Sequence, residues 1–272
     1  MQVTALSDGV AAQPLEQIII ASPADVRRAL AKARLPNPTP TSVNAFVLQA
    51  GNRLVLVDTG AGIGQMAGMG GAAEALKVAG YTADQVDEVW LTHMHSDHLG
   101  GLVQSGAMAF PNAVVRIDQR EADHWLSTAN AKAAPDASKG MFEAAQAAIA
   151  PYQSAGRVKP FIAPAELLPG IGALPAPGHT QGHTVYLIES QGQKLALLGD
   201  LVNEIQFTLP RAASRFDTDG KEAVSSRNKL FATAAREGWR VAVAHMPFPG
   251  LGRLYGEGKG FRFVAEGYDP AK

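Results

Sequence analysis

The stretch "LTHMHSDHLGG" at residues 91–101 constrains this chain more than any other feature of its sequence. It places His93, His95, Asp97 and His98 within six positions, although the whole chain has only seven histidines. Imidazoles and a carboxylate crowded at the end of an apolar strand need partners, because burying unpaired polar groups is costly. Divalent metal ions such as zinc suit imidazole and carboxylate together. We therefore expect a metal site in this segment.

The spacing within the block predicts ligands for two ions. Residues i and i+2 of an extended segment share a face, so His93 and His95 can bind one ion together. The following "DHLGGL" suits the start of a helix, with Asp97 in its first turn. That change of direction turns Asp97 and His98 to a different side, where they can hold a second ion.

Further polar residues follow three other apolar strands. They are His179 and His183 in "APGHTQGHT", Asp200 in "LALLGD" and His245 in "VAVAHMPFPG". Taken singly, His179 and Asp200 are typical turn residues, and His245 is typical of a core histidine. Because loops at strand ends often carry function, their occurrence in order after apolar strands favours one shared site.

The order of predicted elements indicates an α/β fold with mixed sheets. Helical and strand patterns alternate, but hairpins such as "FVLQAGNRLVLVDTG" interrupt the alternation. The segments "GNRLVLVDTG" and "GQKLALLGD" resemble each other; two similar halves would explain this, and so would the general likeness of hairpins. With no linker or short repeat, we expect a single domain over residues 1–272, with a helical segment at about 120–157 between the halves.

Composition and missing motifs exclude several classes of function. A net charge of -1 and a pI near 6.7 favour neither nucleic acid nor an anionic membrane surface as partner. The absence of cysteine excludes disulfides and a thiolate nucleophile, and "GxSxG" is absent too. The start "MQVTALSDGV" lacks the basic and apolar regions of a signal peptide. We expect a soluble protein, cytoplasmic as written, or periplasmic or secreted if a leader was removed.

Several motifs together resemble a known family. "LVLVDTG", "THMHSDHLGG", "APGHTQGH", "LLGD" and "VAHMPFPG" are similar to the ordered motifs of the metallo-β-lactamase superfamily, over nearly the whole chain. The resemblance implies a four-layer αβ/βα sandwich with mixed β-sheets and a metal site at one edge. It also implies two divalent ions per chain, with zinc as the default and Mn²⁺, Co²⁺ or Fe²⁺ as alternatives.

The resemblance implies a role for each residue of the motifs. The first ion is expected on His93, His95 and His179, the second on Asp97, His98 and His245, and Asp200 is expected to bridge both. His183 is expected to support the site without binding metal. His124 matches no motif and is interpreted as part of a helix face.

Within the superfamily, the chain looks most like methyl parathion hydrolase and its lactonase relatives. The segments "VTALSDG", "TSVNAF", "EADHWLS", "SKGMF" and "EGKGFRFV" carry this resemblance. It implies hydrolysis of small neutral lactones, aryl esters and organophosphate triesters by a hydroxide shared between the ions. Asp97 or Asp200 would take up the proton, Trp125 and Phe142 would line the substrate pocket or belong to the core, and a homodimer is usual.

Two features depart from that subgroup, and two alternatives stay open. Asn203 stands where the subgroup commonly has histidine, and "NEIQFTLPRAASRF" is shorter; both bear on the choice of substrate. A glyoxalase II-like thioesterase would use the same metal ligands. A non-catalytic metal-binding module is less favoured, because such proteins typically lose ligands and all seven are present here.

Overall fold

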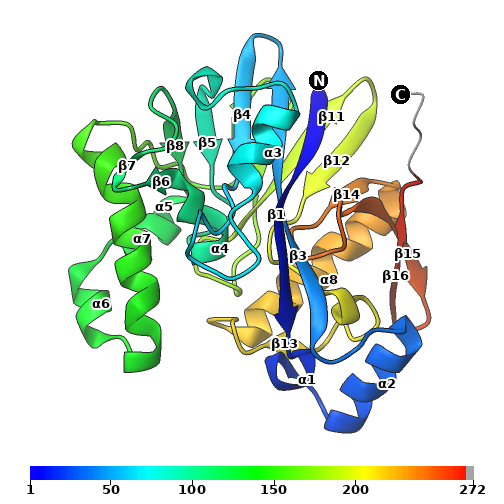
Figure 1. Cartoon of the computed structure of the whole chain (residues 1–272). Helices are drawn as coiled ribbons and strands as arrows, with labels where there is room; N and C mark the ends of the chain where they lie inside the picture. The colour runs from blue at the N-terminus through cyan, green and yellow to red at the C-terminus, as the bar shows by residue number, and fades with distance from the viewer. Residues whose placement is uncertain (268–272) are drawn as a thin grey trace.

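Two β-sheets packed face to face form the centre of the molecule (Figure 1). The computed structural model describes residues 1–267, so the last five residues of the domain expected over 1–272 lie outside the described part. The first sheet has the strand order β1-β3-β4-β5-β8 and the second the order β16-β15-β14-β12-β11-β10-β9.

The bounds of the strands follow the chain in order. The first sheet comprises β1 (Gln2–Gln13), β3 (Thr39–Ala50), β4 (Arg53–Val57), β5 (Glu88–Trp90) and β8 (Val114–Arg116). The second comprises β9 (Ala165–Leu168), β10 (Ile171–Pro175), β11 (Thr184–Ser190), β12 (Gln193–Leu197), β14 (Arg240–Ala242), β15 (Leu251–Glu257) and β16 (Gly260–Ala265). Two short pairs complete the set, β2 (Ile19–Ile20) with β13 (Ala213–Ser214) and β6 (Val103–Gln104) with β7 (Ala107–Met108).

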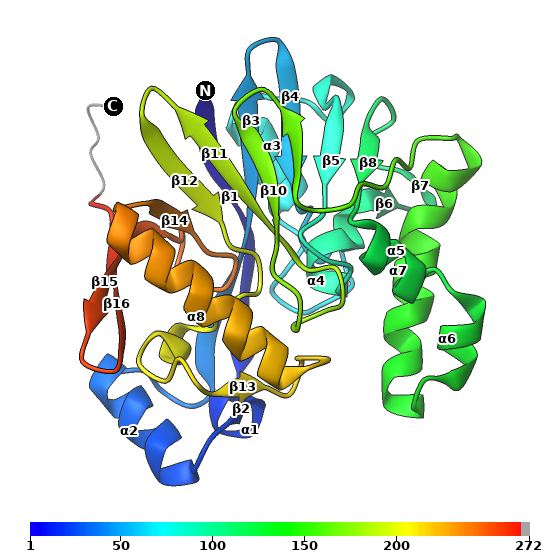
Figure 2. The same cartoon turned by 180° about the vertical axis from the view of Figure 1, so that it is seen from behind.

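Helices cover the outer face of each sheet. Those on the side of the first sheet include α3 (Ala72–Val78) and α7 (Asp136–Ser154), and α8 (Gly220–Glu237) covers the second sheet. Figure 1 shows α3 in front of the first sheet, and Figure 2, from behind, shows α8 in front of the second. The remaining helices are α1 (Leu15–Ile18), α2 (Pro23–Ala33), α4 (Ser96–Leu99), α5 (Gln119–Trp125), α6 (Thr128–Ala133), η1 (Ala83–Gln85), η2 (Gly100–Leu102) and η3 (Glu204–Phe207). The helix–sheet–sheet–helix order is the expected four-layer sandwich.

The hydrophobic pattern of β4 explains this layering. Successive side chains of a strand point to opposite faces. Val55 and Val57 therefore pack toward the second sheet, while Leu54 and Leu56 pack toward the helices. A strand buried on both faces needs a continuous apolar run, which "LVLV" supplies. Between the sheets, the rings of Trp90 and Tyr186 lie with centroids 5.3 Å apart.

The direction of the strands places several loops at one edge of the sandwich. β4, β5 and β8 run parallel in the first sheet, and β12 runs parallel to β14 in the second. β10 and β12 are each antiparallel to β11, so β10 points the same way as β12. The carboxyl ends of β10, β12 and β14 therefore share an edge.

The helical segment expected at about 120–157 is present as α5, α6 and α7, which lie between Gln119 and Ser154. The sequence patterns did not indicate α2 or β15. In β15, "LGRLYGE", two glycines and an arginine interrupt the apolar residues, which weakens the strand signal. No helix within residues 1–267 is long and apolar enough to cross a membrane.

Candidate metal centre

The loop after β5 changes from extended to helical backbone within the histidine block. His95 is extended, with φ -73° and ψ 153°, and it stands immediately before α4. The amide groups of His98 and Leu99 both donate to the carbonyl of His95, at 3.0 and 3.2 Å. This is the predicted change of direction, and it turns Asp97 and His98 away from the line of His93 and His95.

Two glycines after α4 let this loop lie directly on the neighbouring one. A Cβ atom on Gly100 would come within 2.1 Å of the Ala61 carbonyl oxygen, and one on Gly101 within 2.1 Å of the Thr59 oxygen. The amide of Thr59 in turn donates to the carbonyl of His98 at 2.7 Å. The close backbone contact fixes α4 against the loop that follows β4, and explains the "LGG" that ends the motif.

The structure brings together all seven side chains that were predicted to bind metal. Donor atoms of His93, His95, His179 and Asp200 lie within 4.8 Å of one another, as do those of Asp97, His98 and His245. Three of the seven come from the second sheet, where His179, Asp200 and His245 follow β10, β12 and β14. We call these seven residues the His/Asp cluster.

Asp200 lies between the two groups of the cluster. Its Oδ1 atom is 2.9 Å from Nε2 of His98 and 3.0 Å from Nε2 of His245. Its Oδ2 atom is 3.4 Å from Nε2 of His179. One carboxylate therefore reaches both groups, which is the position expected of a bridging ligand. Asp97 is more peripheral, with Oδ2 at 3.4 Å from His245 and 3.7 Å from His98.

Four imidazoles of the cluster are fixed through the ring nitrogen that faces away from it. A ligating histidine usually donates its other N–H to a protein acceptor, which sets its tautomer and orientation. Here each Nδ1 atom lies against an oxygen: Thr92 Oγ1 for His93 at 3.1 Å, Asp58 Oδ2 for His98 at 2.8 Å, Asp217 Oδ1 for His179 at 2.9 Å and the Ser42 carbonyl for His245 at 3.0 Å. In each case Nε2 is left to face the cluster.

Asp58 is an important supporting residue that sequence reasoning did not single out. Its carboxylate accepts the Thr92 amide and the Thr92 hydroxyl, each at 2.8 Å, and accepts the imidazole of His98. Because Thr92 also contacts His93, one buried carboxylate supports both groups of the cluster. Asp58 has φ 58°, the left-handed region that aspartate tolerates better than most residues. Its place in the family motif "LVLVDTG" is the sequence signal by which Asp58 could have been identified as part of the site.

His183 and Glu121 hold the loops of the cluster in place. The Nε2 atom of His183 accepts the amide of Asp200 at 3.1 Å, which is a supporting contact. Burial, with the neighbouring His179, lowers the pKa of His183 to about 3, so its ring is a neutral acceptor. Buried Glu121 of α5 accepts the amides of Met94 and Gly182, at 2.9 and 2.8 Å. It therefore joins the loop after β5 to the loop after β10, a role that no motif indicated.

The charges of the cluster are arranged around Asp200. Burial alone raises the pKa of this carboxyl, but the imidazoles of His245 and His98 outweigh burial and hold it well below its usual range. Burial lowers the pKa of His245 and His98, yet the Asp200 carboxylate raises it, to about 9 for His245. Because an imidazole must be neutral to bind a metal ion, binding there would displace protons.

The cluster fits divalent metal ions by the chemistry of its donors. Within residues 1–267, the buried Nε2 atom of His93 has no hydrogen-bond partner, although it faces the other donors. His95 Nδ1 and His179 Nε2 approach to 3.1 Å. Two nitrogens bound to one zinc at about 2.0–2.1 Å in tetrahedral geometry would lie about 3.4 Å apart. Five imidazoles and two carboxylates match the nitrogen and oxygen ligands of zinc and related ions.

A cavity of about 630 Å³ opens beside the cluster, with His95 and Asp217 among its lining residues. Both predicted pocket residues, Trp125 and Phe142, line it, although their side chains are also part of the core. The Trp125 ring is 5.6 Å from the His95 ring between centroids. His124, which matched no motif, lines the same cavity.

Asn203 is not among the residues that line this cavity. Its side chain instead caps η3, within the segment that looked shorter than in the subgroup. The backbone N–H of Asn203 donates to the side-chain oxygen of Gln206 at 2.8 Å. The position at which the subgroup commonly has histidine therefore lies at the N-terminus of η3, outside the lining of this cavity.

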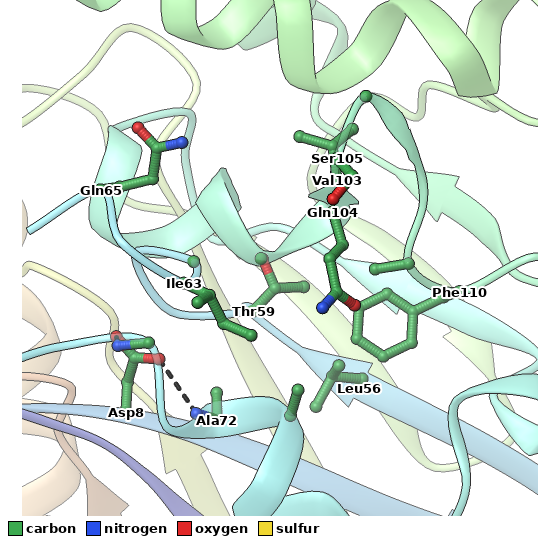
Figure 3. A pocket seen from close by; sticks show the side chains of 16 residues that line it. Asp8, Leu56, Thr59, Ile63, Gln65, Ala72, Val103, Gln104, Ser105 and Phe110 are labelled. Carbon is green, nitrogen blue, oxygen red and sulfur yellow. Dashed lines mark hydrogen bonds between the residues drawn. The ribbon is translucent and has the colours of Figure 1, made fainter.

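A second, smaller cavity of about 320 Å³ lies at the glycine-rich loop after β4. Figure 3 shows Asp8 on one side of it and Phe110 on another. The buried Asp8 carboxylate accepts the amides of Ala61, Gly70 and Ala72, at 2.9, 3.1 and 3.0 Å. No residue of the His/Asp cluster lines this cavity, and Asp8 serves to fix the loop that begins at Asp58.

Solved structures of similar proteins share the fold of this chain. A hydrolase named AbOPH, described as in the beta-lactamase superfamily, is 34% identical, with a TM-score of 0.93 over 98% of this chain and 95% of that one. AidC, a dizinc quorum-quenching lactonase in complex with a product, N-hexanoyl-L-homoserine, is 28% identical, with a TM-score of 0.90 over the same shares. A probable metal-dependent hydrolase from Staphylococcus aureus, at 18% identity and a TM-score of 0.82 over 97% of this chain and 96% of that one, shares the fold.

The family comparison covers most of the chain. A search of curated proteins found no match. Residues 38–245 match the metallo-beta-lactamase superfamily, a range that contains every residue of the His/Asp cluster. Together with the four-layer fold, this match shows that the chain belongs to the metallo-beta-lactamase superfamily.

Proposed function

We propose that the chain is a dinuclear metal-dependent hydrolase of small neutral lactones and aryl esters, with activity on organophosphate triesters. One observation carries the proposal. Seven metal-binding side chains converge in two groups around Asp200, directly beside a cavity whose wall is aromatic. Such a concave apolar site with a few convergent polar groups is typical of a small-molecule enzyme.

The geometry supports the ligand sets that the family resemblance implied. His93, His95 and His179 would hold one ion, and Asp97, His98 and His245 the other. Asp200 would contact both, because its two oxygens face donors of both groups. Zinc is the default for such donors, and the similar AidC is described as dizinc. Manganese, cobalt or ferrous iron suit the same donors and depend on supply.

Bound there, two divalent ions would supply a hydroxide near neutral pH and polarise a carbonyl or phosphoryl oxygen. The residues around the cluster orient its imidazoles and carboxylates. The Nδ1 contacts fix four imidazoles, and His183 fixes the backbone of Asp200. Asp97 and Asp200 are the two carboxylates of the cluster, and one of them would take up the proton released during attack.

The cavity supports neutral substrates with an apolar group. Trp125 and Phe142 offer an aromatic wall, with ring centroids 4.7 Å apart. The structure of AidC contains an acyl homoserine product, which favours lactones as the substrate class here. Arg215 also lines the cavity and would pair with a carboxylate of a glutathione thioester, so this substrate of the alternative thioesterase is included in the test below.

The first experiment compares substrates on metal-loaded protein. The value of kcat/KM would be measured side by side on dihydrocoumarin, methyl parathion and a glutathione thioester, after the metal content has been determined. We expect close to two ions per chain and the highest value on dihydrocoumarin. A higher value on methyl parathion would make the enzyme a phosphotriesterase, and one on the thioester would favour the alternative. Equal rates from fully metal-stripped protein would overturn the proposal.

Two further expectations accompany the proposed function. The subgroup resemblance implies a homodimer, which sedimentation velocity of the metal-loaded protein would check. The sequence also implies that neither nucleic acid nor a membrane is a partner. Loss of monodisperse behaviour on adding duplex DNA or anionic vesicles would contradict that expectation.

A further inference from the structure

His124 is the histidine that the proposed metal chemistry does not use. It lies on α5, half-buried, and lines the cavity beside the His/Asp cluster. Its backbone carbonyl accepts the side-chain amide of Asn130 at 3.1 Å. Within residues 1–267 neither nitrogen of the His124 ring makes a hydrogen bond to the protein, so neither is occupied by a protein partner.

The rings of His124, Trp125 and Phe142 pack against one another, and we call them the aromatic triangle. The centroid of the His124 ring lies 5.0 Å from that of Trp125, edge-on at 89°, and 5.1 Å from that of Phe142. The Trp125 and Phe142 rings are themselves 4.7 Å apart. Packing on two sides holds the imidazole in one orientation, which lowers the entropy lost when it forms a hydrogen bond.

Within the triangle, His124 alone has polar ring atoms left for a ligand. The indole N–H of Trp125 is already donated to Glu121 at 2.7 Å, and phenylalanine has no polar atom. Burial lowers the pKa of His124 below its ordinary value, so the imidazole is neutral near pH 7. A neutral imidazole has one donor and one acceptor, which suits a hydroxyl group, itself both donor and acceptor.

The position of His124 defines which part of a substrate it would meet. Trp125 lies between it and the cluster, with its ring 5.6 Å from His95 and 5.0 Å from His124. A group reacting at the cluster reaches His124 only through a substituent that extends past Trp125. The cavity, at about 630 Å³, is large enough for such a substituent.

We propose that His124 is a specificity-determining residue, which selects substrates whose aryl group carries a hydroxyl substituent at the end distant from the reacting bond. The proposal rests on the proposed function, because it takes this cavity as the substrate site. It goes further by naming the chemistry of the distal group and the residue that recognises it.

The first test measures binding without turnover. Metal-loaded protein would be titrated calorimetrically with 4-(hydroxymethyl)phenol and with 4-ethylphenol, which match in size and differ in one hydroxyl. We expect the wild type to bind the hydroxymethyl compound about fivefold or more tightly, the effect of one net hydrogen bond. His124→Phe keeps an aromatic ring without nitrogens, and the preference should disappear. Equal affinity of the wild type for both phenols, or no binding of either, would overturn the proposal.

Two further variants make the result specific to the imidazole. His124→Gln restores a donor and an acceptor and should recover part of the preference. Ser138→Ala removes another polar side chain that lines the same cavity and should leave the preference as in the wild type. A preference lost equally in Ser138→Ala and His124→Phe would assign the effect to the cavity as a whole and overturn the role of His124.

The second test separates this proposal from the proposed function. The esters 4-(hydroxymethyl)phenyl acetate and 4-ethylphenyl acetate have leaving groups of similar intrinsic reactivity, and kcat/KM would be compared for both. The wild type should favour the hydroxymethyl ester, and His124→Phe should not. If the phenols bind as expected and neither these esters nor dihydrocoumarin is hydrolysed, the enzymatic proposal fails and the recognition by His124 stands. If both esters are hydrolysed with the same ratio in the two proteins, the recognition fails and the enzymatic proposal stands.

Discussion

Each of the two sheets contains a pair of parallel strands, and the two pairs correspond to each other. The loops that follow these strands contribute differently to the cluster. In the first sheet Val57 of β4 pairs with Trp90 of β5, and in the second Leu197 of β12 pairs with Ala242 of β14. The third residue beyond Trp90 is His93, and the third beyond Ala242 is His245. The same position in each sheet therefore carries a histidine of the cluster.

The aspartates that follow β4 and β12 show how small shifts change a role. Asp58 is the first residue after β4, whereas Asp200 is the third after β12. Asp58 lies behind the imidazoles and supports His98, while Asp200 reaches the centre and faces both groups. Gly199 has φ 53°, and a Cβ atom there would come within 2.8 Å of His183 Nε2. The chain thus passes His183 closely before it presents Asp200.

The largest effect is expected from Asp200→Asn. This substitution removes the carboxylate shared by both sets of donors, and under the proposed function each ion held there would contribute several kcal/mol to hydrolysis. We expect kcat/KM to fall by roughly 1,000-fold or more, with fewer than two ions bound per chain. Kinetics on dihydrocoumarin and metal analysis of the same sample would check this. Two retained ions with wild-type activity would show that Asp200 has no central role.

A smaller effect is expected from Asp58→Asn, with Asp217→Asn as the matched control. The Asp58 carboxylate supports His98 directly and His93 through Thr92, whereas Asp217 supports His179 alone within the cluster. Loss of such supporting contacts typically costs 10- to 100-fold, and we expect about 100-fold for Asp58→Asn and about 10-fold for Asp217→Asn. Measurements of kcat/KM and zinc affinity for both variants would check this. A larger loss in Asp217→Asn than in Asp58→Asn would contradict the central role of Asp58.

The smallest effect is expected from Tyr186→Phe, which breaks a contact between the two sheets. The hydroxyl of Tyr186 in β11 donates to the carbonyl of Leu91, just after β5, at 2.7 Å, and both groups are buried. Leaving that carbonyl unpaired should lower the free energy of unfolding by about 1–3 kcal/mol at pH 7, measured by urea denaturation. If Tyr186→Phe keeps wild-type kcat/KM at saturating metal, the substitution affects the stability of the fold and not the metal centre.

The pH dependence of the same pair of proteins sharpens this prediction. Burial, with the carboxylates of Asp58 and Asp118, raises the pKa of Tyr186 well above its ordinary value of 10. The folded state therefore keeps a proton that the unfolded state loses, so this contribution is complete below pH 10 and declines as the pH rises further. The difference in stability between wild type and Tyr186→Phe should shrink above pH 10. A difference that grows there would contradict the assignment.

The N-terminal part of the cluster was predictable because it is local. His93, His95, Asp97 and His98 lie within six residues, and strand and helix geometry alone predict two directions for them. The α/β class with mixed sheets was predicted from helical and strand patterns interrupted by hairpins, and the four-layer sandwich was implied by the family resemblance; both are confirmed. The family resemblance was confirmed by the match over residues 38–245.

The supporting residues were not predictable in the same way. Asp217 and Glu121 contact the cluster loops from positions 38 residues after His179 and 27 residues after Met94. No local pattern connects such residues, since a buried carboxylate can find its donors anywhere along the chain. His124 was interpreted as part of a helix face, whereas the packing of α5 against α7 places it in the wall of the cavity.

The sequence by itself determines the α/β architecture, because the periods of two and 3.6 residues that distinguish strands from helices run along the chain. It also determines the dense histidine block, because those residues are neighbours in the sequence. The meeting of His179, Asp200 and His245 with that block depends on strand order and on how many residues follow each strand. These are properties of two sheets packed together, and the same packing decides which carboxylate lies at the centre and which imidazole faces the cavity.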